Sequence, residues 1–145
     1  MYVDWEQLER LPAIDTLIDV GVGAKGTEDL YERFSDKKMV LIDPLDEAEA
    51  YFNDRMFHKD AYFFKTALGA ETSELEIKVE EKIGRSTLLN VADINYEGEP
   101  VDKRMVSVRR LDDVMKESGD CGNLGLKIDT EGFELNVIKG AEETL

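Results

Sequence analysis

The chain has few of the residues that mark secreted or membrane-spanning proteins. Its single cysteine, Cys121, rules out an internal disulfide bond. No apolar run reaches the roughly 20 residues that a membrane-spanning helix requires. The first residues, MYVDWEQLERLP, carry acids where a signal peptide would carry basic and then apolar residues. We therefore expect a soluble, cytoplasmic protein with no membrane partner.

Basic residues and metal ligands are also scarce. The sequence has 18 lysines and arginines against 33 aspartates and glutamates, and its net charge of −15 would repel a phosphate backbone. We therefore expect no nucleic-acid partner. His58 is the only histidine, so histidine and cysteine cannot form a cluster with metal-ligand spacing, and we expect no tightly held transition metal. A magnesium ion held weakly by carboxylates stays an open alternative.

Apolar segments of strand and helix type alternate along the chain. The 145 residues suffice for one packed core, and we expect a single domain over residues 1–145. Strands of parallel type are predicted at Thr16–Val20, Met39–Asp43, Tyr62–Leu68 and Leu124–Asp129. Helices are predicted over 4–12, 27–34, 48–56 and 111–119, and at the C-terminal end. This order predicts an α/β fold, with a mainly parallel sheet between helices and a ligand beyond the carboxyl ends of the strands.

Three local expectations accompany this fold. The aromatic residues of the strand at Tyr62–Leu68 are assigned to the core. Alternating apolar and charged residues at Glu74–Glu80 predict an inserted strand with one wet face, continuing through GRSTLL at Gly84–Leu89. The closing helix is expected to bury Leu135, Ile138, Ala141 and Leu145.

A glycine loop follows the first strand. Gly21, Gly23 and Gly26 have the spacing G-x-G-x-x-G between a strand and a helix, although glycines also serve any tight turn. Asp43 follows at the tip of the next strand, and an acid about 20 residues after the loop suits a ribose, because a carboxylate accepts from both hydroxyls. We therefore predict a nucleoside derivative as the ligand.

Asp19 distinguishes between two such ligands. A dinucleotide would bring its pyrophosphate close to this carboxylate, whereas S-adenosylmethionine brings an ammonium and a sulfonium. Asp19 therefore favours S-adenosylmethionine. Lys25, inside the loop, argues mildly for the dinucleotide.

Several motifs in order resemble the FkbM-type methyltransferases. They are LIDVGVGAKG, VLIDP, TALG, GRSTLL, RRLDDVM and LKIDTEGFELNVIKGAEETL. The resemblance implies a Rossmann-like class I methyltransferase fold and S-adenosylmethionine as the cofactor. It also implies methyl transfer to a hydroxyl oxygen of a small molecule or saccharide. Asp19, Gly21, Gly23, Gly26 and Asp43, with Ala67 and Leu68 of TALG, then become the cofactor-binding residues.

The sequence departs from this family in two respects. Asp43 stands where glutamate is frequent, a shorter side chain that still reaches a ribose. The family fold also continues with further strands after the helix that follows IDTEG. We therefore expect that the C-terminal strands are missing, or that a homo-oligomer covers the sheet edge.

Asp129 and Glu131 are the candidate catalytic pair, because they follow the fourth strand at the ligand edge. Methyl transfer needs an acceptor oxygen that is positioned and relieved of its proton. Alternatively, Glu131 caps the helix that begins near Gly132. Asp112 and Asp113 are interpreted as caps, while Arg85, Ser86 and Thr87 are open to a role in acceptor binding or in a turn.

Two further functions stay open. One is a nicotinamide-dependent oxidoreductase that uses the same glycine turn. The other is a catalytically inactive methyltransferase-like module that only binds partners.

Overall fold

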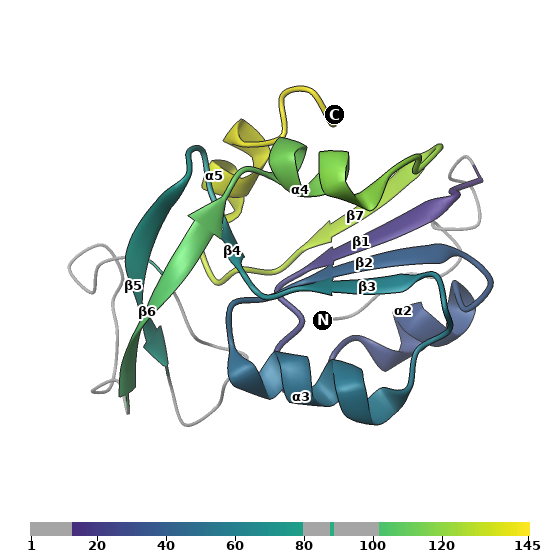
Figure 1. Ribbon diagram of the computed structural model, residues 1–145, viewed down its shortest axis with the longest axis horizontal. Helices are drawn as coiled ribbons and strands as arrows, with labels where there is room; N and C mark the ends of the chain where they lie inside the picture. Colours follow the sequence, from purple (N-terminus) through teal and green to yellow (C-terminus); the bar gives the residue numbers. More distant parts are fainter. Residues whose placement is uncertain (1–12, 80–87, 89–101) are drawn as a thin grey trace.

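The computed structural model describes residues 13–79, 88 and 102–145. Four parallel strands form sheet A in the order β3-β2-β1-β7 (Figure 1). Their bounds are Ala61–Phe64 for β3, Lys38–Ile42 for β2, Thr16–Val20 for β1 and Leu124–Ile128 for β7. The predicted strands at 16–20, 39–43 and 124–129 are therefore confirmed to within one residue at each end. The predicted leading helix at 4–12 lies outside the described residues.

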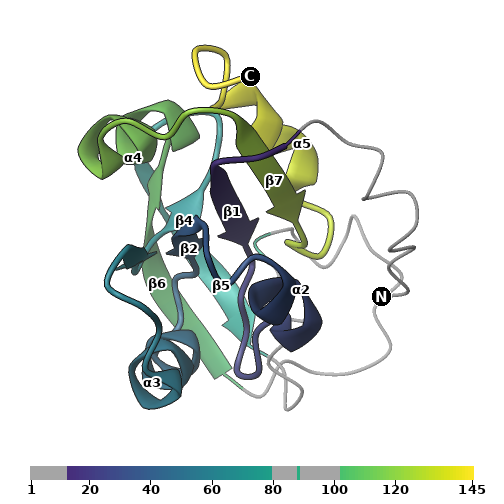
Figure 2. The same ribbon diagram turned by 90° about the vertical axis from the view of Figure 1, so that its right-hand side faces the viewer.

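Helices cover both faces of sheet A, as the alternation of strand and helix predicts. Helices α2 (Glu28–Arg33) and α3 (Asp46–Arg55) lie on one face, and α4 (Leu111–Ser118) and α5 (Glu134–Lys139) on the other (Figures 1 and 2). Side chains of successive strand residues point to opposite faces. Leu17 and Met39 accordingly pack with α2 and α3, whereas Ile18 and Val40 pack with α4 and α5. The result is a Rossmann-like α/β layer structure.

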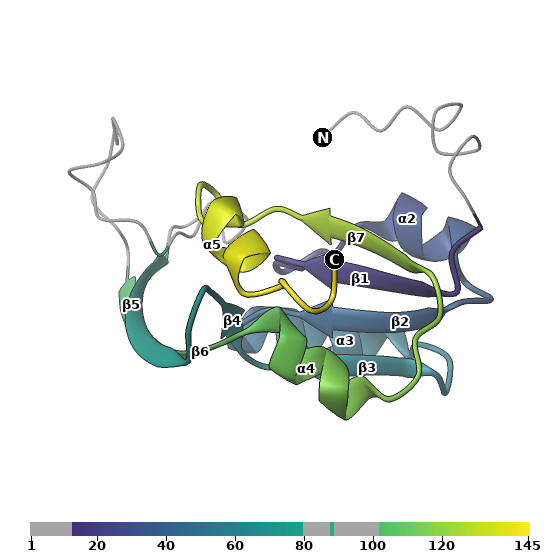
Figure 3. The same cartoon turned by 90° about the horizontal axis from the view of Figure 1, so that it is seen from above.

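A second, smaller sheet stands beyond the carboxyl ends of these strands. Sheet B has the order β4-β6-β5, with β4 at Ala67–Leu68, β5 at Ser73–Val79 and β6 at Asp102–Arg109 (Figure 3). The predicted inserted strand at Glu74–Glu80 is β5, and its Ile77 and Val79 are buried. Sheet B therefore forms a wall beside the edge where parallel sheets bind ligands.

The single strand expected at Tyr62–Leu68 is wrong, because the chain turns within it. The amide of Thr66 donates a hydrogen bond to the carbonyl of Phe64 at 2.9 Å. The hydroxyl of Thr66 donates a hydrogen bond to the carbonyl of Ser107 at 3.0 Å. The turn sends Ala67–Leu68 into sheet B, where it pairs with β6. β3 is left at the edge of sheet A, so Tyr62 is 43% exposed and does not belong to the core.

The buried face expected for the closing helix is also largely wrong. Leu135, Ile138 and Leu145 are 62%, 47% and 70% exposed, whereas Val137 and Ala141 are buried. The reason lies at Gly140, where a Cβ would come within 2.1 Å of the carbonyl oxygen of Gly69. This close backbone contact directs Val137 and Ala141 into the core formed with α4.

In the part of the chain that the structure describes, no helix is long and apolar enough to cross a membrane. The strand β7 pairs with β1 on one side, and no other described strand pairs with its second side.

Candidate functional site

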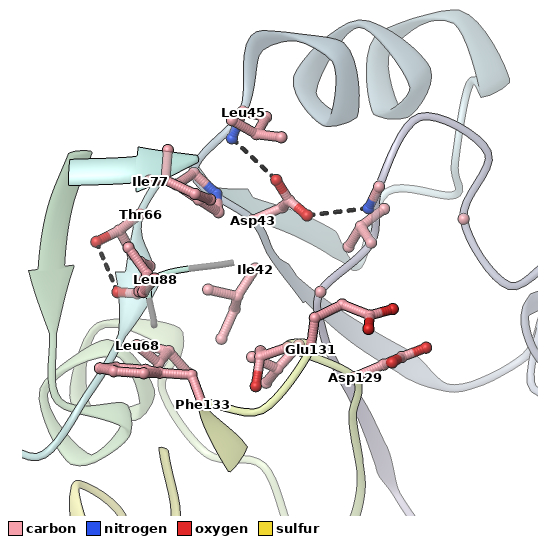
Figure 4. A pocket seen from close by; sticks show the side chains of 18 of the residues that line it. Ile42, Asp43, Leu45, Thr66, Leu68, Ile77, Leu88, Asp129, Glu131 and Phe133 are labelled. Carbon is pink, nitrogen blue, oxygen red and sulfur yellow. Dashed lines mark hydrogen bonds between the residues drawn. The ribbon is translucent and has the colours of Figure 1, made fainter. Parts of the chain in front are cut away.

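A pocket of about 620 Å³ opens where the carboxyl ends of sheet A meet sheet B (Figure 4). The glycine loop and the segment after β7 line one part of it, and apolar side chains from β2, β4 and β5 line the other. Of the predicted site residues, it is lined by Gly21, Gly23, Gly26, Asp43, Ala67, Leu68, Asp129 and Glu131. The fold thus brings together all the predicted site residues except Asp19, which does not line the pocket.

The glycine loop has the backbone that its sequence predicts. Gly21, Gly23 and Gly26 have φ angles of 85°, 63° and 58°, in the left-handed region that favours glycine. No side chain fits at Gly21, because a Cβ there would lie 1.9 Å from the carbonyl oxygen of Asp129. The loop and the segment after β7 therefore touch through their backbones.

Asp43 holds the glycine loop from the tip of β2. One of its carboxylate oxygens accepts a hydrogen bond from the amide of Gly23 at 2.9 Å, and the other accepts from the amide of Leu45 at 2.9 Å. Burial raises the pKa of Asp43, and these amide hydrogen bonds oppose the rise. A carboxylate offers about four acceptor positions, so Asp43 can still accept a hydroxyl group from a ligand in the pocket.

Asp19 lies beneath the glycine loop and is 1% exposed. Its carboxylate accepts a hydrogen bond from the hydroxyl of Tyr31 and forms an ion pair with Lys127 Nζ at 2.9 Å. Burial raises the pKa of Asp19, while the charge of Lys127 lowers it. The predicted contact between Asp19 and the ammonium of a ligand stays a prediction, but the charge of Asp19 already has a partner in the protein.

Asp129 and Glu131 lie together in the loop between β7 and α5, and Figure 4 shows both beside the pocket. Glu131 has a φ of 51°, an uncommon left-handed backbone for a residue with a side chain. One oxygen of Glu134 accepts hydrogen bonds from the amides of Thr130 at 2.9 Å and Gly132 at 3.1 Å. Burial alone would raise the pKa of Glu134, but these backbone hydrogen bonds lower it.

The cap interpretation of Glu131 gains no support from this loop. The N-cap residue of α5 is Phe133, and Glu134 is the side chain that accepts from the loop amides. The cap prediction for Asp112 and Asp113 is wrong for their own helix, α4, whose N-cap residue is Arg110 and which has no side-chain cap hydrogen bond. Asp112 instead caps amides near the end of the chain. It accepts from the amides of Glu143 at 3.1 Å and Thr144 at 3.0 Å.

Lys127 lines the pocket and pairs with Asp19, but it was not predicted as a site residue. A signal was present, since a lysine in a strand of otherwise apolar residues is rarely buried without an ionic partner. Lys127 and Asp129 are also two positions apart, and in an extended chain this spacing places their side chains on the same side. Thr66, Ile77 and Phe133 also line the pocket and were not predicted as site residues. Arg85, Ser86 and Thr87 lie outside the described residues.

The described residues contain no group of three or more histidine, cysteine, aspartate or glutamate side chains arranged to hold a metal ion. The charged groups that line the pocket are Lys25, Asp43, Lys127, Asp129 and Glu131. Lys127 is paired with buried Asp19 and also lies 3.9 Å from an oxygen of Asp129.

Comparisons with known proteins agree with this architecture. The crystal structure of methyltransferase FkbM from Methylobacillus flagellatus KT is similar to the chain, with a TM-score of 0.56 and 17% sequence identity. The similarity covers 93% of this chain and 31% of that protein, so the chain spans less than a third of its length. Among curated proteins, none matches the chain. The sequence profile of the methyltransferase FkbM domain matches residues 19–145. The chain therefore belongs to the FkbM methyltransferase family.

Proposed function

We propose that the protein is an S-adenosylmethionine-dependent methyltransferase that acts on a hydroxyl oxygen of a small molecule or saccharide. One observation carries the proposal: a single pocket joins the glycine loop, the buried acid Asp43 and the acidic loop of Asp129 and Glu131. In a member of this family, these are the parts that a nucleoside-bearing methyl donor requires.

The residues present fit S-adenosylmethionine. Gly21 and Gly23 bring the loop backbone to the pocket without side chains, and the carboxylate of Asp43 retains acceptor capacity for a ribose hydroxyl. Leu45, Leu68 and Ile77 offer an apolar surface on which an adenine can lie. The cofactor supplies an electrophilic methyl group on a sulfonium sulfur.

The acceptor is handled by residues of the loop after β7. Glu131 is exposed at the pocket, where its carboxylate can accept a proton from an acceptor hydroxyl, and Asp129 lies beside it. Phe133 and sheet B limit the space for the acceptor. Anionic acceptors are disfavoured, because an anion would meet the carboxylates of Asp129 and Glu131.

A dinucleotide fits this pocket less well. Its pyrophosphate would need the N-terminus of the helix after the glycine loop. That helix, α2, carries Glu28 and Asp29 in its first turn. Glu28 is paired with Arg55 at 2.8 Å, and Asp29 would repel the phosphates. This observation argues against the alternative of a nicotinamide-dependent oxidoreductase.

Isothermal titration calorimetry tests the cofactor. We expect S-adenosylmethionine and S-adenosylhomocysteine to bind with one site per chain, and NAD and NADP to give no binding heat. Binding of a nicotinamide cofactor without binding of S-adenosylhomocysteine would refute the proposal.

A transfer assay tests the reaction. The protein is incubated with S-adenosylmethionine labelled in its methyl group and with a panel of neutral saccharides, polyols and secondary alcohols. A labelled product that survives mild alkali is expected, because methyl ethers resist alkali whereas methyl esters hydrolyse. A protein that binds the cofactor but labels no member of the panel would favour the inactive binding module.

A further inference from the structure

Lys127 connects three segments that meet under the pocket. Its side chain is 15% exposed, and its Nζ lies 2.9 Å from an oxygen of Asp19 at the end of β1. The same Nζ donates a hydrogen bond to the carbonyl of Gly21 at 3.0 Å and lies 3.9 Å from an oxygen of Asp129. Nothing in the proposed reaction requires a lysine, so this arrangement needs its own explanation.

The first part of the explanation is electrostatic. A carboxylate that is 1% exposed is costly unless it is paired and hydrogen-bonded. Tyr31 and Thr27 give Asp19 two neutral donors, and Lys127 gives it the opposite charge. Lys127 therefore lowers the cost of burying Asp19 as an anion.

The second part concerns the two loops. Gly21 and the backbone of Asp129 are already in contact, and the amide of Asp129 donates to the carbonyl of Val20 at 2.9 Å. The ammonium of Lys127 adds a bond to the glycine loop and an attraction to the Asp129 carboxylate, whose side chain is 46% exposed. One cation thus fixes the loop backbone and the direction of an acid that lines the pocket.

We propose that Lys127 is a positioning residue, which holds the glycine loop against Asp129 so that the loop backbone and the Asp129 carboxylate receive the methionyl end of the cofactor. The part that concerns the cofactor rests on the function proposed above. The positioning of the two loops does not, because it concerns the free protein.

The competing explanation is that Lys127 only neutralises Asp19. A double variant separates the two, because Lys127→Met with Asp19→Asn leaves no unpaired buried charge but removes the donor to Gly21. The comparison uses Asp19→Asn, Lys127→Met and the double variant. Lys103→Met is the matched control, because Lys103 is 55% exposed and pairs with Glu76 on sheet B.

Two measurements are made on folded protein at low temperature. The first is amide hydrogen exchange of Gly21, Gly23 and Asp129 without ligand, since all three amides are hydrogen-bonded. The second is the affinity for S-adenosylhomocysteine. Relative to Asp19→Asn, we expect the double variant to exchange these amides at least about tenfold faster and to bind at least about tenfold more weakly, as for the loss of a bond from a charged donor.

Each outcome decides the proposal. Equal exchange and equal affinity in the double variant and in Asp19→Asn would overturn it, and so would the same losses in Lys103→Met. If the parent protein binds no S-adenosylhomocysteine, the proposed function fails, while the exchange comparison still decides whether Lys127 positions the loops. Faster exchange confined to the two loops, with normal exchange in β2 and α4, supports positioning.

Discussion

Gly21 and Asp129 touch backbone to backbone across the ends of two neighbouring strands, β1 and β7. A Cβ at Gly21 would lie 1.9 Å from the carbonyl oxygen of Asp129 and 2.8 Å from its carbonyl carbon. Backbone atoms cannot rotate away as a side chain does. The contact therefore fixes the distance between the glycine loop and the loop after β7 that carries Glu131. The geometry of the site therefore depends on a residue that has no side chain.

Gly21→Ala should destabilise the fold through two separate effects. The positive φ alone costs about 1–3 kcal/mol for a residue with a Cβ. The clash with Asp129 adds about 1–3 kcal/mol of overpacking. Gly119→Ala is the control, because Gly119 has a φ of 74° but nothing within 4 Å of its added Cβ. Denaturant titration should show the larger loss in Gly21→Ala, and equal losses would disprove the importance of the contact.

Asp43 should make cofactor binding sensitive to pH. Burial raises its pKa above the ordinary 3.8, so it takes up a proton at a higher pH than an exposed aspartate. In the proposed function the ionised form accepts from the ribose, and affinity for S-adenosylhomocysteine should therefore fall on acidification, by at most about tenfold per pH unit. Asp43→Asn should bind about 1.5–3 kcal/mol more weakly at neutral pH and show a flatter profile. A parent profile parallel to that of the variant would contradict this role.

The stability of the free protein should respond to the same group with the opposite sign. The folded state binds the Asp43 proton more tightly than the unfolded state. Its contribution to the free energy of unfolding therefore falls as the pH rises from 3.8 through the raised pKa, and is constant above it.

Glu131→Gln tests the general base. The substitution keeps the shape and the hydrogen-bonding reach but removes the basic carboxylate. We expect unchanged affinity for S-adenosylhomocysteine and a single-turnover transfer rate lower by roughly a hundredfold or more. Glu131→Gly should be equally slow, although it tolerates the φ of 51°. Full activity in the glycine variant would show that only the backbone at this position matters.

Glu134→Ala should loosen the loop that carries Glu131. It removes the acceptor of two loop amides, so a loss of about 1–3 kcal/mol in the free energy of unfolding is expected. Glu134→Gln retains an oxygen at the same place and should lose less. Thermal melting of the two variants provides the comparison, and identical melting temperatures would show that the hydrogen bonds contribute little.

Asp112→Ala should affect stability without affecting the cofactor. Asp112 is 2% exposed, and one of its oxygens accepts from the amides of Glu143 and Thr144. Leaving those amides without an acceptor costs about 1–3 kcal/mol. The exposed neighbour Asp113 serves as the control, and Asp113→Ala should melt like the parent. Weaker binding of S-adenosylhomocysteine by folded Asp112→Ala would contradict this structural role.

The fold could be predicted largely from the sequence because its parallel strands have clear sequence signals. β1 and β2 are short apolar runs that end in glycine or proline, and such patterns arise where both faces of a parallel strand are covered. The turn at Thr66 could not be predicted, because the apolar residues of Tyr62–Phe64 before it and Ala67–Leu68 after it are typical of one continuous strand. It depends on hydrogen bonds to Ser107, which lies far along the sequence.

The candidate site also contains residues that could be predicted from the sequence and residues that could not. Asp43 and the three glycines were predictable from spacing, which reflects local geometry between one strand and the next. The pairing of Lys127 with Asp19 was not, since it joins residues more than a hundred positions apart. The buried face of α5 also depended on a distant contact, that of Gly140 with Gly69. Long-range contacts of this kind leave little trace in periodicity.

The parallel pairing of β1 with β7 has a consequence for the order of folding. The glycine loop and Asp43 are made early in synthesis, but the carbonyl of Asp129 and the ammonium of Lys127 arrive with a strand that is paired across more than a hundred residues. Closing so long a loop is slow compared with local contacts. A nascent chain should therefore acquire affinity for the methyl donor only after β7 has been made, and the donor, by binding only the paired arrangement, should draw β7 into place.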